Sequence, residues 1–137
     1  ASDNEERSAE LCSKHLEAVG VANERRGRIA RLIMATKHLG KVDAYGDGVD
    51  HVGEVLQDID LSILGTPPPR YRRYVAQIRK EHRYISDTAF RDGRRRVVTH
   101  FLAKKRLYRT EYFFARFEIQ ARQNLALERS GAAPKWF

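Results

Sequence analysis

DIDLSILG, residues 58–65, runs directly into TPPPRY, residues 66–71, and this stretch decides how the chain folds. Two carboxylates, Asp58 and Asp60, stand against a run of leucine and isoleucine. A glycine and three prolines then force the chain to turn. A carboxylate buried among apolar residues needs a hydrogen-bond donor, a cation or a metal. A plainer interpretation is that Asp58 ends one helix and Asp60 caps the next turn, because aspartate is common at helix ends.

The residues before this stretch predict three helices. Ser2 or Asp3 can cap the first helix, acidic residues occupy its first turn, and Gly20 supplies a stop. The second helix has an apolar stripe beside an arginine-rich face. The third is shorter and leads to the turn at Asp60. The predicted ranges are 3–19, 22–37 and 49–58.

Three more helices are predicted after the turn. Thr66 caps a fourth helix that runs to about Tyr84, with prolines in its first positions, where a missing N–H costs nothing. Ser86 caps a fifth helix, and Thr110 caps a last one over about 111–129. No stretch alternates in the manner of a strand. We therefore expect an all-α fold of about six helices, forming a single domain over residues 1–137.

The composition is that of a folded, strongly basic protein. Hydrophobic residues make up 42% of the 137, and the formal net charge is +8 with a pI near 9.9. Such an excess of positive charge suggests an anionic partner: RNA or DNA, a phosphorylated small molecule, or an acidic protein. The alternative is a basic surface that only meets solvent.

A single cysteine, Cys12, excludes an internal disulfide. It favours a reducing compartment such as the cytoplasm or an organelle matrix. No apolar run approaches the length needed to cross a bilayer, and no signal peptide is visible, so we expect no membrane partner.

Six blocks of sequence occur here in one order. They are SDNEERSAEL (2–11), LIMATKH (32–38), DIDLSILGTPPPRY (58–71), FRDGRR (90–95), FLAKKRLYRTEYF (101–113) and ARQNL (121–125). The ordered set resembles the predicted metal-dependent phosphohydrolases of the HD superfamily, and in particular a subfamily with DNEE-SA, TKHH and DADLSILG blocks. The resemblance extends from Ser2 to about Leu127.

The resemblance implies an HD-type helical domain and a role for four residues. Asp60 would be the distant carboxylate that closes the metal site. Glu5 would orient a water or act as general base, while Lys37 and His38 would face the substrate phosphate. The metal of a complete family member would be Mn, Fe, Mg, Zn or Ni, which lowers the pKa of bound water and polarises the phosphoryl group.

The family also has a first histidine and a His-Asp pair, which lie ahead of the DNEE block. The sequence begins inside that block, so we expect it to be the C-terminal portion of an HD domain, or an HD-like protein without its front half. Two other positions depart from the family. TKHH is Thr36-Lys37-His38-Leu39 here, and a helix motif REY-x-H is replaced by Lys80-Glu81-His82-Arg83-Tyr84.

Two functions follow as hypotheses. The first is a metal-dependent phosphohydrolase acting on a phosphate ester or nucleotide, and inactive as this chain alone. The second is a catalytically dead, HD-derived basic subunit of a larger RNA–protein or organellar assembly. Tyr71, Tyr74 and Tyr84 could stack on bases there, and the simpler alternative is that they pack on neighbouring helices. We further expect Asp60 and His38 to approach each other with Glu5 on the same side. Six cations should face outward: Arg25, Arg28, Arg72, Arg79, Arg95 and Lys104.

Overall fold

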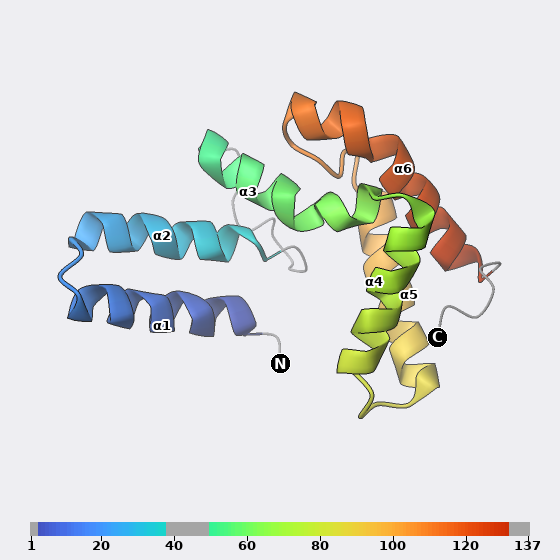
Figure 1. The fold of residues 1–137 in the computed structure, drawn as a ribbon, viewed down its shortest axis with the longest axis horizontal. Coiled ribbons are helices and arrows are strands. Elements are labelled where there is room, and N and C mark those ends of the chain that lie inside the picture. Colours follow the sequence, from blue (N-terminus) through green and yellow to red (C-terminus); the bar gives the residue numbers. More distant parts are fainter. Residues whose placement is uncertain (1–2, 38–49, 132–137) are drawn as a thin grey trace. The chain divides into compact units, whose positions relative to one another are not determined.

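A computed structural model describes residues 3–37 and 50–131 of the chain. The all-α class predicted from the sequence is confirmed, because the described residues form six α-helices and a short 3-10 helix and contain no strand (Figure 1). None of these helices is both long and apolar enough to cross a membrane. The elements are α1 (Asn4–Ala18), α2 (Asn23–Ala35), α3 (His51–Leu61), η1 (Ser62–Gly65), α4 (Pro68–Glu81), α5 (Asp87–Ala103) and α6 (Glu111–Ser130).

Several helix ends follow from local chemistry, as predicted. The hydroxyl of Ser86 accepts a hydrogen bond from the Ala89 N–H at 3.2 Å, and the hydroxyl of Thr110 accepts one from the Phe113 N–H at 3.5 Å. Each satisfies an N–H that has no partner within the helix. Gly131 ends α6 with φ of 66°, a left-handed conformation that glycine adopts without steric cost.

The turn after DIDLSILG differs from the prediction in two ways. Helix α3 does not end at Asp58 but continues to Leu61, so Asp60 lies within the helix. Thr66 does not cap α4, which begins at Pro68. The Thr66 hydroxyl instead donates to the carbonyl of Ile63 at 2.8 Å, closing the end of η1.

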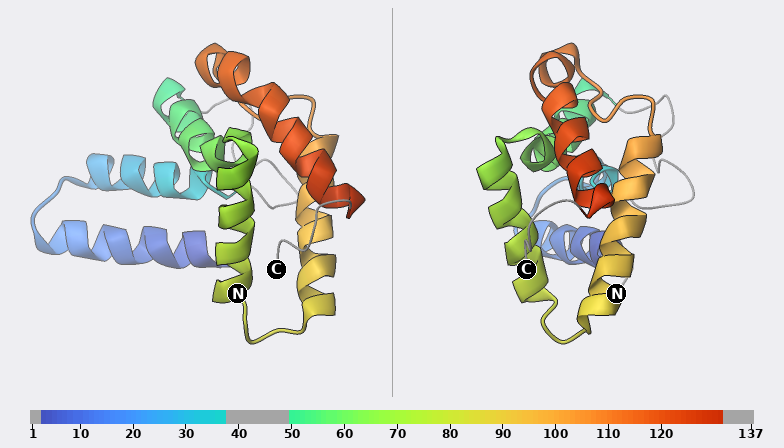
Figure 2. Two further views of the ribbon diagram at one scale, coloured as in Figure 1. Left: turned by 45° about the vertical axis from the view of Figure 1, so that its right-hand side comes forward. Right: turned by 90° about the vertical axis from the view of Figure 1, so that its right-hand side faces the viewer.

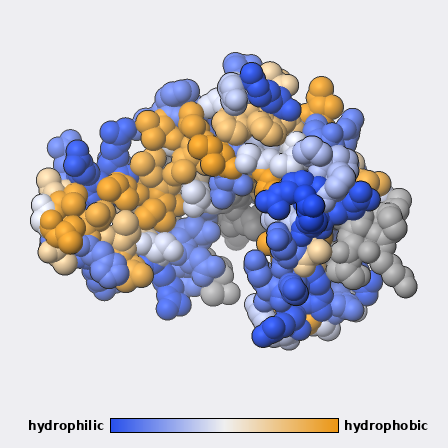
Figure 3. Space-filling model, viewed as in Figure 1, coloured by the Kyte–Doolittle hydropathy of each residue, from blue (hydrophilic) through white to orange (hydrophobic). Residues whose placement is uncertain are grey.

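The chain divides into two compact units, residues 1–57 and 58–137. In the first unit, α1 and α2 pack side by side as an antiparallel hairpin (Figure 1). Only Ala9 and Ala35 are buried hydrophobic residues of these two helices. Figure 3 shows apolar residues gathered on the visible face of the hairpin. Leu11 of α1 is 56% exposed. The single domain expected over residues 1–137 stays a prediction.

The second unit holds the hydrophobic core. Helix α6 packs against η1 and α5, and α4 also contacts η1 (Figure 2). Every helix of this unit contributes side chains, and so does the α5–α6 loop, residues 104–110. The buried members of the core are Leu61, Leu64, Tyr71, Val75, Val98, Phe101, Leu107, Tyr108, Ala121 and Leu125.

Candidate functional site

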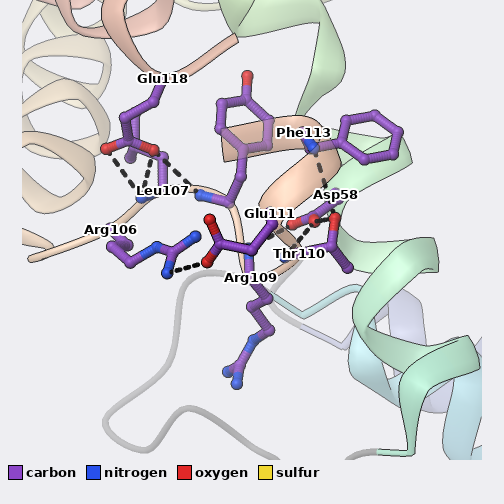
Figure 4. Close-up of polar contacts among 9 residues, drawn as sticks. Asp58, Arg106, Leu107, Arg109, Thr110, Glu111, Phe113 and Glu118 are labelled. Carbon is purple, nitrogen blue, oxygen red and sulfur yellow. Dashed lines mark hydrogen bonds and ion pairs between the residues drawn. The ribbon is translucent and has the colours of Figure 1, made fainter. Parts of the chain in front are cut away.

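Asp58 is fully buried and binds the end of the α5–α6 loop. Its carboxylate accepts hydrogen bonds from the N–H groups of Arg109 at 2.7 Å and Thr110 at 2.8 Å, and from the Thr110 hydroxyl at 2.6 Å (Figure 4). Three donors offset the cost of burying the charge. A buried carboxylate needs a donor, a cation or a metal, and here backbone N–H groups of a loop are the donors.

Two residues of α6 hold the start of the same loop. The buried carboxylate of Glu118 accepts from the Leu107 N–H at 3.0 Å and from the Tyr108 N–H at 3.3 Å. Arg122, one turn along, forms an ion pair with Glu118 at 2.7 Å. Its guanidinium also donates to the carbonyls of Lys104 at 2.8 Å and Lys105 at 3.0 Å. These bonds satisfy carbonyls of the loop just after the end of α5.

A further pair of polar side chains fixes the DIDLSILG turn itself. The amide of Asn124 donates to the carbonyls of Leu64 and Thr66, both at 2.8 Å. The hydroxyl of the buried Tyr108 donates to the carbonyl of Leu61 at 2.9 Å. The turn and the α5–α6 loop are thus held against α6 by hydrogen bonds from buried side chains.

Helix α6 is also tied to α4 and α5 by a buried carboxylate. Arg94 binds Glu128 through two parallel hydrogen bonds of 2.8 and 2.9 Å, and the Tyr71 hydroxyl donates to the same carboxylate. The paired side chains of Arg94 and Glu128 are only 11% and 9% exposed. Burial, with the nearby Glu128 charge, raises the pKa of Tyr71 well above its usual range. These residues stabilise the unit by joining its three long helices.

Lys37, one of the predicted catalytic residues, meets the acidic first turn of α1, which also holds the predicted Glu5. The α1–α2 hairpin brings Lys37, just past the end of α2, to the first turn of α1. There the Lys37 ammonium forms an ion pair with Glu6. This hydrogen bond raises the pKa of Lys37, and the carboxylates of Glu5 and Asp3 add to the effect. The same bond lowers the pKa of Glu6.

The other two predicted residues are placed differently. Asp60 is exposed on α3, in the second unit. His38 lies outside the described residues, so the expected approach of His38 to Asp60 stays a prediction. Among residues 3–37 and 50–131, no three His, Cys, Asp or Glu side chains come together in a way that could hold a metal ion. The described residues alone therefore do not make a metal centre.

The positive charge of the chain is concentrated in one unit. Residues 1–57 contain 8 Lys and Arg against 10 Asp and Glu, a net charge of −2. Residues 58–137 contain 18 Lys and Arg against 8 Asp and Glu, a net charge of +10. Of those 18 cations, 14 are arginine. In the described part of this unit, 3 of the acidic residues, Asp58, Glu118 and Glu128, already bind protein donors away from the surface.

The six cations expected to face outward do not behave alike. Arg25, Arg72 and Arg95 are exposed, as predicted, and the face of α4 seen in Figure 3 is mostly hydrophilic. Arg28 is exposed but pairs with Asp50 at 3.2 Å, and Lys104 is half-buried.

For Arg79 the prediction was wrong. Its guanidinium pairs with Asp87 at 2.6 Å and donates to the carbonyls of His82 at 2.8 Å and Ile85 at 3.2 Å. Arg79 closes the α4–α5 turn instead of facing solvent.

The tyrosines proposed to stack on bases differ in how exposed they are. Tyr71 is fully buried in the core, so it cannot receive a base. Tyr74 is half-buried, with the Arg94 guanidinium 5.8 Å from its ring centre. Tyr84 is 77% exposed. A further exposed tyrosine, Tyr112, was not singled out from the sequence.

Sequence reasoning missed Glu118, Arg122, Asn124 and Glu128. A signal was present, because Glu118 and Arg122 lie four residues apart and directly follow the apolar positions Phe117 and Ala121 of α6. A polar side chain on an apolar stripe needs a buried partner.

Comparison with known proteins found no matching family model, no matching curated protein and no matching solved structure. Membership of the HD superfamily therefore stays a prediction from the ordered sequence blocks.

Proposed function

We propose that this chain carries part of a metal-dependent phosphohydrolase of the HD type, acting on a phosphate ester or nucleotide. The proposal rests on the six sequence blocks and on one observation, the meeting of Lys37 with the acidic first turn of α1. In the family comparison these two segments contribute to the site, and here the hairpin brings them together. The 137-residue chain alone is inactive, because the first histidine and the His-Asp pair are not among its residues.

The ion pair constrains how Lys37 would meet a phosphate. Its ammonium is engaged by Glu6. A phosphate group must therefore compete with the Glu6 carboxylate for the same cation. Glu5 is half-buried beside this pair and carries the carboxylate suited to a general base. Asp60 supplies an exposed carboxylate of the type that a divalent metal binds.

The test is a hydrolysis assay on the whole gene product, with Mn²⁺ or Mg²⁺ and a panel of nucleotides and phosphate esters. We expect turnover that a chelator removes and that Asp60→Ala abolishes. The matched control is Asp92→Ala, which changes another exposed aspartate, on α5. The purified 137-residue chain should show no turnover. Activity that survives Asp60→Ala, or that the 137-residue chain displays by itself, would contradict the proposal.

A second candidate is favoured by the charge distribution. A net charge of +10 over residues 58–137 exceeds what one phosphate-binding site needs. The second candidate is a basic, HD-derived subunit that binds RNA within a larger assembly. Binding of RNA by this chain, together with an inactive gene product, would favour the second candidate over the first.

A further inference from the structure

The α5–α6 loop is a rigid segment that carries exposed cations. Its backbone is bound at both ends, by Glu118 and Arg122 at its start and by Asp58 at its close. Exposed side chains on a fixed backbone lose less conformational entropy on binding than the same side chains on a free loop. The loop is therefore preorganised to present Lys105, Arg106 and Arg109.

Two flat stacking surfaces adjoin these cations. The guanidinium of Arg116 lies 3.9 Å from the ring centre of Tyr112, and Tyr112 is 59% exposed. The guanidinium of Arg106 lies 3.9 Å from the ring centre of Phe114. An arginine already stacked on a ring offers its other face, and an exposed tyrosine offers its ring, to a nucleobase.

The loop and the first turn of α6 contain few acidic residues. Between Lys104 and Arg116 the only acidic residue is Glu111, and it pairs with Arg106 at 2.8 Å. Figure 4 shows the Arg109 side chain extending away from Glu118, and the Arg106 guanidinium turned toward the Glu111 carboxylate. Arg109, Lys105 and Arg116 are exposed and form no ion pair with a described carboxylate.

We infer that this loop surface, defined as Lys105, Arg106, Arg109, Tyr112 and Arg116, binds single-stranded nucleic acid. Cations contact the phosphates, and Tyr112 and Arg106 stack on bases. The stacking surfaces favour nucleic acid over an acidic peptide or an anionic membrane, because only nucleic acid presents a flat base beside each phosphate. The inference deepens the second candidate function by naming its surface, and it does not depend on the phosphohydrolase.

The test measures fluorescence anisotropy of a labelled oligouridine with the purified chain. If three cations contact phosphates, affinity should fall about fifteenfold between 50 and 200 mM salt, from a slope of about −2. The triple variant Lys105→Glu, Arg109→Glu, Arg116→Glu should lose at least about tenfold in affinity and lower the slope. Its matched control, Arg91→Glu, Arg95→Glu, Arg96→Glu, makes the same charge change on exposed cations of α5 and should lose far less.

Stacking has its own pair of variants. Tyr112→Ala should weaken binding about tenfold, as loss of a base–aromatic contact does. Tyr84→Ala, which removes another exposed tyrosine, should change nothing. Circular dichroism melts should be unaltered, because all the substituted side chains are exposed. Oligothymidine in place of oligouridine tells whether the 2′-hydroxyl contributes.

Three results would overturn the inference. The first is an equal loss of affinity in the two triple variants, which would mean that binding depends on net charge alone. The second is unchanged affinity of Tyr112→Ala. The third is competition by polyglutamate, or by vesicles containing phosphatidylserine, as strong as that of oligouridine at equal charge. The absence of any binding would overturn the second candidate function as well, whereas retained binding by the loop variant would overturn only this surface.

Discussion

Asp58 binds Arg109 and Thr110, which lie 51 and 52 residues further along the chain. One fully buried carboxylate satisfies two backbone N–H groups and a hydroxyl. Removing the carboxylate would leave those donors unsatisfied, which costs more than the bonds themselves contribute. Asp58 is therefore a structural residue, although it stands beside the predicted metal ligand in sequence.

The first prediction concerns this carboxylate. Asp58→Ala should lower the free energy of unfolding by at least about 3 kcal/mol, since several charge-assisted hydrogen bonds are lost at once. Asp92→Ala, at an exposed position, should change it by no more than about 0.5 kcal/mol. Urea denaturation followed by circular dichroism measures both. Equal stability of the two variants would contradict the assigned role of Asp58.

Arg94 allows a second prediction at this scale. Arg94→Met removes the cation and leaves Glu128 buried without its partner, so unfolding should become easier by about 3 kcal/mol. Arg95→Met changes the neighbouring, exposed arginine and should have little effect. Adding Glu128→Met to Arg94→Met should recover part of the loss, because no unpaired charge then remains. Failure of the double variant to recover would show that the pair itself, and not its desolvation, dominates.

At the scale of elements, η1 approaches α6 closely at Gly65. A Cβ atom placed there would lie 2.6 Å from the Phe117 Cβ and 2.8 Å from the Phe117 carbonyl oxygen. Backbone cannot move aside as a flexible side chain can. The glycine of DIDLSILG is therefore required by the approach of two helices and not by its own conformation.

Two glycine substitutions should change stability in opposite directions. Gly65→Ala should destabilise the chain by about 2 kcal/mol or more, as overpacking does. Gly93→Ala, within α5, meets nothing within 4 Å and should stabilise it by about 0.5 to 1 kcal/mol, because alanine favours helix. Thermal melts of the two variants measure the difference. A loss of stability in both would show that α5 needs Gly93 for a reason other than space.

The elements were largely predictable from sequence because their ends depend on neighbouring residues. Ser86 and Thr110 cap helices through bonds to N–H groups three residues ahead. The loop contacts were not predictable, since the partners of Asp58, Glu118 and Asn124 depend on which distant backbone groups the fold brings near. Arg79 was misjudged for the same reason. Helical periodicity predicted an exposed Arg79 side chain, but carbonyls of the α4–α5 turn accept hydrogen bonds from its guanidinium.

Across the whole molecule, the two units differ in how much they bury. The first unit buries two alanines of α1 and α2, whereas the second buries large side chains such as Tyr71 and Leu125. Hydrogen exchange should therefore be faster in α1 and α2 than in α4, α5 and α6, because local opening there exposes less apolar surface. Exchange measured by mass spectrometry on peptides from each helix tests this. Equal protection in both units would contradict it.

The separation in sequence of the loop's partners has a consequence for the order of folding. Glu118 lies 11 residues from Leu107, whereas Asp58 lies 52 from Thr110, and closing the longer loop costs about 1.4 kcal/mol more in chain entropy. The loop should thus dock on α6 before Asp58 reaches it. In stopped-flow kinetics, Glu118→Gln should mainly slow refolding, and Asp58→Ala should mainly accelerate unfolding. A newly made chain would complete α6 first and secure the DIDLSILG segment last.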